Sequence, residues 1–143
     1  MTESNRREAA DRIHSAAIHL LRRVREADAE AMGLSPARAS ALSVLVFSGA
    51  RSLTELAEAE RVTPATMSKL VTGLEHAGLV QRHPDVNDAR AIRIESTAKA
   101  RRILERGRAS RLELLQQLLS EATEDEIEAV RIAAEAIERA LHA

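Results

Sequence analysis

The sequence predicts a mainly α-helical protein that contains one two-stranded β-hairpin. The chain of 143 residues is 45% hydrophobic but only 1% aromatic, so its core must be aliphatic. Five Gly and three Pro are too few for the many turns of an all-β protein. Apolar residues recur at spacings of three and four in both terminal parts, whereas they alternate with polar residues only around positions 79–95. The length fits one compact protomer.

The N-terminal segment predicts an amphipathic helix from about Asn5 to Met32. Gly33 follows as a C-cap, because glycine adopts the left-handed conformation without penalty. Ser35 and Pro36 then begin a second helix, as N-cap and first helical residue. The apolar residues of the first helix follow a helical spacing: Ile13, Ala17, Leu20, Leu21 and Val24.

The middle of the chain predicts two helices joined by a tight turn. Residues 52–55, Ser-Leu-Thr-Glu, match a capping box that opens a short helix. After Arg61 and Val62, Thr63 and Pro64 begin the next helix, which ends near Gly78. Two helices separated by so short a turn cross at a steep angle, which is typical of a helix-turn-helix. The inner face of the second helix consists of Met67, Leu70, Val71 and Leu74.

Residues 79–95 predict a two-stranded hairpin, or wing. Val80 and Arg82 on one side, and residues 92–94 on the other, alternate apolar with polar. Turn-forming residues occupy 84–88 between them. The predicted fold is therefore mainly α with a two-stranded β wing: a winged helix-turn-helix flanked by terminal helices.

The C-terminal part predicts two further helices, one from Thr97 to about Ser120 and one opened by a capping box at 123–126. The last helix carries apolar residues at heptad spacing. Terminal helices far from the wing need partners for their apolar stripes, which predicts a homodimer; packing within a monomer is the alternative. The candidate dimerisation residues are Ile13, Leu20, Ile127, Val130, Ile137 and Leu141. The predicted division is 1–34 and 97–143 for dimerisation and 35–96 for DNA binding.

The outer face of the helix that begins at Pro64 predicts contact with double-stranded DNA. Its small residues would let the helix enter a major groove about 12 Å wide, and its hydroxyls would hydrogen-bond to bases or phosphates. In isolation, such a polar face is more often simply solvated; the neighbouring turn and wing favour DNA. The candidate residues in and before this helix are Arg38, Ser52, Pro64, Ala65, Thr66, Ser68, Lys69 and Thr72.

The predicted wing supplies a second set of candidate DNA contacts: Arg82, Asp88, Arg90 and Arg93. An arginine at the hairpin tip would enter the minor groove, where negative potential is concentrated. Phosphate would repel Asp88, so we expect its carboxylate to orient Arg90 by a charge-assisted bond. Taken alone, the hairpin would be an ordinary charged surface with weak ion pairs.

Net charge does not favour nucleic acid, because the chain has a formal charge of -1 and the segment 51–95 is not basic overall. DNA binding therefore requires that the cations cluster on one side. The alternative is a winged-helix module that binds another protein instead of DNA. An exposed apolar patch on the outer helix face would favour that alternative.

The sequence lacks the motifs that are typical of enzymes and metal-binding proteins. There is no Cys, no HExxH motif, no Gly-rich phosphate loop and no Gly-x-Ser-x-Gly elbow. His14 and His19 are five residues apart and point to different faces of one helix. We therefore expect no enzyme activity, no metal site and no cofactor. No signal peptide or run of about 20 apolar residues is present, which predicts a cytoplasmic protein without a membrane partner.

Taken together, these motifs resemble the MarR family of transcriptional regulators over nearly the whole chain. The resemblance rests on residues 53–57, 62–68 and 74–80, on Asp88-Ala89-Arg90 and on Thr97. It implies an obligate homodimer with interlocking terminal helices, a recognition helix from Pro64 and a minor-groove arginine at Arg90. It further implies a repressor that a small aromatic or phenolic ligand, bound between the two parts, releases from its operator. Phe47 is the sole aromatic residue, which limits ring stacking on such a ligand.

Two positions depart from the family pattern. Ser96 stands where leucine is usual, which would loosen the junction between the wing and the next helix. Ala100 stands where glycine is usual, which would only strengthen that helix.

Overall fold

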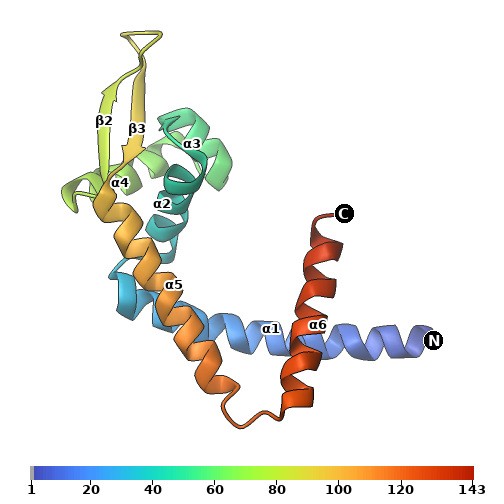
Figure 1. The fold of residues 1–143 in the computed structure, drawn as a ribbon. Helices are drawn as coiled ribbons and strands as arrows, with labels where there is room; N and C mark the ends of the chain where they lie inside the picture. The colour runs from blue at the N-terminus through green and yellow to red at the C-terminus, as the bar shows by residue number, and fades with distance from the viewer. Residues whose placement is uncertain (1) are drawn as a thin grey trace. The chain divides into compact units, whose positions relative to one another are not determined.

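A computed structural model describes residues 2–143 and confirms a mainly helical chain with a small antiparallel sheet (Figure 1). By contacts the chain divides into two compact units, one ending at Arg111 and one spanning Leu112–Ala143. The elements are α1 (Glu3–Met32), α2 (Pro36–Ser48), β1 (Arg51–Ser52), α3 (Leu53–Glu60), α4 (Pro64–His76), β2 (Val80–Pro84), β3 (Ile92–Ser96), α5 (Ala98–Leu118) and α6 (Glu124–Leu141).

Local capping signals set the helix boundaries where the sequence predicts them. Gly33 ends α1 in the left-handed conformation, with φ of 63°. The Ser35 hydroxyl accepts a hydrogen bond from the Arg38 backbone N–H at 3.3 Å. Capping boxes open α3 at Ser52 and α6 at Thr123. These bonds satisfy backbone N–H groups that a helix start leaves free.

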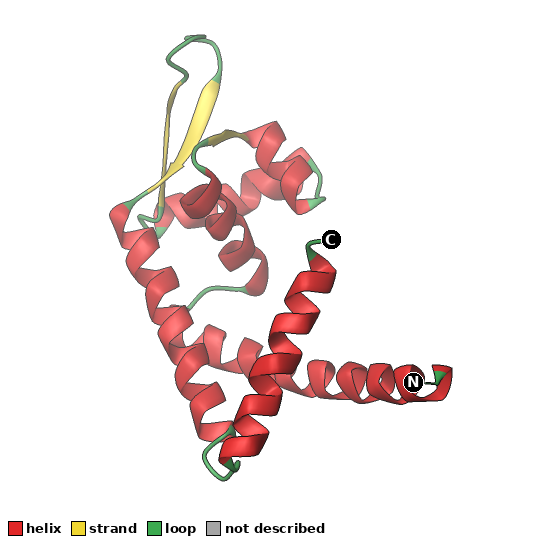
Figure 2. Ribbon diagram, turned by 45° about the vertical axis from the view of Figure 1, so that its right-hand side comes forward, coloured by secondary structure: helices red, strands yellow, loops and turns green. Residues whose placement is uncertain are grey.

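The predicted wing is present as the hairpin of β2 and β3, with His83 opposite Arg93 in the register. A third strand that the sequence did not predict, β1, pairs with β3 and gives the order β1-β3-β2. With only two residues, β1 is too short to show an alternating pattern. Figure 2 shows the hairpin extending beyond the helices that surround its base.

The first unit contains one aliphatic core, which lies between residues 32 and 104. Its fully buried side chains come from α2, α3, α4, the sheet and the residue before β2. They include Leu42, Leu45, Leu56, Met67, Val71, Leu74, Leu79, Val80 and Ile94. Ala100, one of the two departures from the family pattern, is also buried there. Leu70, which the sequence places on the inner face of α4, is only partly buried against this core.

The second unit contains the end of α5 and all of α6. No residue of α6 is buried, although the helix has a pronounced apolar stripe. Leaving this apolar stripe in water costs free energy, because each Å² of apolar surface that is buried stabilises a protein by about 25 cal/mol. The unit therefore presents an unpartnered apolar face.

No single helix within residues 2–143 is both long and apolar enough to cross a membrane. Only α1 and α2 taken together reach the required length and composition, and the chain bends by 76° between them.

Candidate nucleic-acid interface

Helix α4 has one buried face and one exposed face. Met67, Val71 and Leu74 are completely buried. On the outer face Pro64, Ala65, Thr66, Lys69 and Thr72 are exposed, and Ser68 is partly buried. No large apolar side chain lies on that face. The exposed apolar patch that would favour a protein-binding module is therefore absent from the outer face of α4.

The start of α4 holds its hydroxyl groups in fixed positions. The Thr63 hydroxyl accepts a bond from the Thr66 N–H at 3.2 Å and donates to the Thr66 hydroxyl at 3.0 Å. The Thr72 hydroxyl donates to the Ser68 carbonyl at 2.9 Å. The threonine oxygens keep free lone pairs, and the Thr66 hydroxyl keeps its proton for an outside acceptor. Lys69 forms no ion pair with any residue that the structure describes.

At the tip of the wing, Asp88 holds the backbone and not the guanidinium of Arg90. Its carboxylate accepts a bond from the Arg90 backbone N–H at 3.0 Å, and its carbonyl accepts one from Ala91 at 3.0 Å. The prediction that the Asp88 carboxylate bonds to the Arg90 guanidinium is therefore wrong. An aspartate bonds readily to a backbone N–H two residues ahead, which stabilises a tight turn. The Arg90 guanidinium is exposed, without a partner among residues 2–143.

The other two wing arginines are engaged in contacts within the protein. Arg93 donates to the Ala50 carbonyl at 2.8 Å and lies 3.7 Å from Glu55 and 3.6 Å from Asp85. These contacts tie β3 to the loop before β1, to α3 and to the tip. The role of Arg93 in DNA binding stays a prediction, but its charge is largely balanced here.

Arg82 joins the wing to α4. Its guanidinium donates to the Thr72 hydroxyl at 3.3 Å and lies 3.5 Å from the Glu75 carboxylate. Both partners are on α4, so Arg82 fixes the base of β2 against the helix that precedes it. Its candidate DNA contact also remains a prediction.

Ser52 and Arg38, the two candidate DNA-binding residues that precede α4, both make contacts within the protein. Ser52 is partly buried, pairs with Arg93 in the sheet and caps α3 by accepting from the Glu55 N–H at 3.1 Å. Arg38 lies in the first turn of α2, is partly buried and has its guanidinium over Gly73 of α4.

Two contacts that the sequence did not predict hold the C-terminal end of α4. The Lys99 ammonium donates to the Ala77 carbonyl, and the Thr97 hydroxyl donates to the Gly78 carbonyl, both at 2.8 Å. They satisfy backbone carbonyls that a helix end leaves free. No local spacing reveals them, since the partners are 19 and 22 residues apart.

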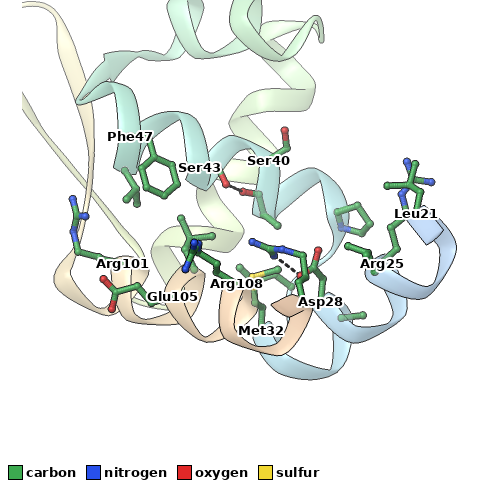
Figure 3. Close-up of a pocket in the computed structure, with 18 residues that line it drawn as sticks. Leu21, Arg25, Asp28, Met32, Ser40, Ser43, Phe47, Arg101, Glu105 and Arg108 are labelled. Atoms are coloured by element: carbon green, nitrogen blue, oxygen red, sulfur yellow. Dashed lines mark hydrogen bonds and ion pairs between the residues drawn. The ribbon is translucent and has the colours of Figure 1, made fainter. Parts of the chain in front are cut away.

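A pocket of about 420 Å³ lies between α1, α2 and α5, within the first unit. Figure 3 shows Leu21, Met32 and Phe47 on its apolar sides and Arg25, Arg101 and Arg108 among its polar groups. Asp28 is paired with Arg111 at 2.5 Å, the contact dashed in Figure 3. The remaining polar lining comprises Glu105, Ser40 and Ser43. Arginines therefore outnumber carboxylates around the cavity.

His83, near the tip end of strand β2, forms two hydrogen bonds that favour its charged form. Its ring nitrogens lie 3.2 Å from the Pro84 carbonyl and 2.8 Å from the Glu95 carboxylate. The carbonyl and then the carboxylate raise the pKa of His83, against burial and the nearby charge of Arg93. A raised pKa means that His83 stabilises the hairpin fully below the ordinary imidazole pKa. This contribution is lost as the pH rises through the raised value.

We expect Glu95→Gln to lower the pKa of His83, because the neutral amide removes the carboxylate that stabilises the imidazolium. Titration of the His83 ring protons by NMR measures this directly. The midpoint should be higher in the unmodified protein than in the variant. Equal midpoints would show that the contact with Glu95 does not form in solution.

Comparison with known proteins finds a family model and several transcriptional regulators that this chain resembles. Residues 34–92, which contain α2 to the start of β3, match the model of the MarR family. An HTH-type transcriptional regulator of Mycobacterium leprae is 29% identical over 137 residues, covering 96% of this chain and 94% of the relative. An HTH-type transcriptional regulator of Mycobacterium tuberculosis is also 29% identical, covering 94% of this chain and 93% of the relative.

Solved structures share the fold over nearly the whole chain. A MarR family protein from Bacillus stearothermophilus superposes with a TM-score of 0.78 at 24% identity, covering 100% of this chain and 99% of the other. A mutant of S. aureus MepR bound to an oligodeoxyribonucleotide gives a TM-score of 0.73 at 20% identity, covering 93% and 97%. With the geometry of α3, α4 and the hairpin, these matches show that the chain has a winged helix-turn-helix fold, is similar to HTH-type transcriptional regulators and matches the MarR family model over residues 34–92.

Proposed function

We propose that this protein is a cytoplasmic repressor that binds operator DNA as a homodimer and leaves it when a small ligand binds. Regulators of the MarR family bind DNA. The observation that carries the proposal is the outer face of α4, which is exposed, rich in hydroxyls and free of large apolar side chains. An exposed, unpaired Arg90 stands at the wing tip.

The contacts that we propose for DNA divide into two groups. The start of α4 enters the major groove, where Ala65 and the threonines contact base edges. The Ala65 backbone N–H and the Lys69 ammonium bind phosphates there. Arg90 enters the neighbouring minor groove. Arg82, Asp88 and Arg93 support the wing by their internal contacts.

Replacing Arg90 by alanine should weaken operator binding by about 1–3 kcal/mol, the usual contribution of one specific arginine contact. A gel-shift titration with a duplex that the unmodified protein has selected from a random library measures the loss. Arg139→Ala, in the last turn of α6 and outside the candidate DNA contacts, is a control that also removes one exposed cation. Equal affinity of the Arg90 variant and the unmodified protein would remove the wing from the interface.

The homodimer is supported by apolar residues that the single chain leaves in water. On α6 these are spaced at threes and fours: Ile127, Val130, Ile137 and Leu141. On α1 Ile13 and Leu20 are exposed as well. Such stripes are typical of helices that pack against a second chain.

Ile137→Asp should break the dimer, because it places a carboxylate where the proposed interface is dry. Sedimentation velocity at micromolar concentration measures the change from dimer to monomer. Arg139→Asp introduces the same carboxylate two residues later, on the opposite side of the helix, and serves as the matched control that should remain dimeric. A profile of Ile137→Asp that contains only dimer would exclude this stripe from the interface.

The ligand site that we propose is the pocket between α1, α2 and α5. Its volume of about 420 Å³ suits a small organic molecule. Its arginines suit a phenolate or carboxylate, and its single aromatic residue, Phe47, leaves shape and charge as the main means of recognition. The aromatic or phenolic class is the one that the family resemblance implies.

Ser40→Trp should reduce the response to such a ligand at least tenfold, because the indole would fill the pocket that Ser40 lines. The measurement is release of the selected duplex by 2-hydroxybenzoate, followed by fluorescence anisotropy. Ser48→Trp, at the end of α2 and outside the pocket lining, is the control. Equal release from both variants would place the ligand elsewhere. No release from the unmodified protein would contradict this phenolic anion as ligand.

A further inference from the structure

Gly73 lies in the interior of α4, where the backbone conformation does not require a glycine. Its φ is not among the positive values, which in this chain belong to Gly33, Gly49, Gly78 and Arg61. Inside a helix, glycine is less favourable than alanine because it loses more conformational freedom on folding. The reason for a glycine must therefore lie in what surrounds it.

The space above Gly73 is occupied by the guanidinium of Arg38. A methyl group added at position 73 would lie 2.6 Å from the Arg38 Cζ and 2.9 Å from its Nε, with Nη2 closer still. The planar group therefore rests directly on the backbone of α4. Arg38 itself is anchored, because its own backbone N–H bonds to Ser35 at the start of α2.

This guanidinium has an unused capacity for hydrogen bonds. It makes no hydrogen bond or ion pair with residues 2–143, although Arg38 is only partly exposed. None of its nitrogens is both buried and unsatisfied, so the group remains open to solvent. A positioned arginine with free donors suits a phosphate oxygen, which accepts two parallel bonds from its planar fork.

The position of Gly73 on α4 shows which flank of the helix Arg38 covers. Gly73 is one turn after Lys69 and shares its side of the helix. Arg82 bonds to Thr72 and approaches Glu75, which lie on the opposite flank. The exposed face of α4 is thus bordered by one arginine from α2 and one from the wing. A helix in the major groove is likewise bordered by two phosphate backbones.

We propose that Gly73 is a positioning residue for DNA binding: it leaves room for the Arg38 guanidinium to lie against α4 and bind a backbone phosphate. The inference rests on the proposed function, since it needs α4 to lie in a major groove. Of the two flanking arginines, Arg82 is already paired with Glu75, so Arg38 carries the free charge. Any side chain at position 73 displaces that charge from its place.

A double-mutant cycle tests this with full-length protein and the duplex selected from a random library. Arg38→Ala should weaken binding several-fold and lower the slope of log affinity against log salt by about 0.9 per lost phosphate contact. Gly73→Ala should do the same while its thermal unfolding midpoint stays equal or rises, since alanine favours the helix. In the Arg38→Ala background, Gly73→Ala should change neither affinity nor slope.

Two results would overturn the proposal. One is an Arg38→Ala protein whose salt slope equals that of the unmodified protein, and this comparison decides the matter even if Gly73→Ala does not fold. The other is a Gly73→Ala protein that folds and loses affinity equally with and without Arg38. If the unmodified protein selects no duplex from the library, the proposed function itself fails. These failures are therefore distinguishable.

Discussion

The exposed face of α4 depends on the burial of its opposite face. Met67, Val71 and Leu74 are completely buried, and they fix both the rotation and the depth of the helix in the core. Rotation by one residue would bring polar side chains inward and leave buried polar groups unsatisfied. The same packing that stabilises the first unit therefore determines which side chains of α4 are exposed.

The helices were predictable because the signals that define them are local. Serine or threonine caps at residues 35, 52, 63 and 123 begin helices where the sequence places them. Apolar spacing gives the buried face of α4, with only Leu70 less buried than expected. Each signal lies within about one helical turn of the feature that it sets, so a single sequence suffices to find it. The hairpin was predictable for the same reason.

The detailed roles at the site were less predictable, because they depend on partners distant in sequence. The sequence marks Arg93 as a cation on a strand, but not the bond that it donates to Ala50, 43 residues away. It marks Asp88 beside Arg90, but not that the carboxylate bonds to the backbone. Two-residue strand β1 and the contact between Arg38 and Gly73 likewise arise only from tertiary packing.

The pocket and helix α4 share part of their apolar surroundings. Met32, Leu34, Val46 and Leu104 line the cavity and also belong to the buried cluster that contains the inner face of α4. Protein interiors are close-packed, so a guest molecule that displaces one of these side chains must also shift its neighbours in the cluster. A ligand that occupied this cavity as proposed would therefore contact side chains of the same aliphatic cluster that holds α4.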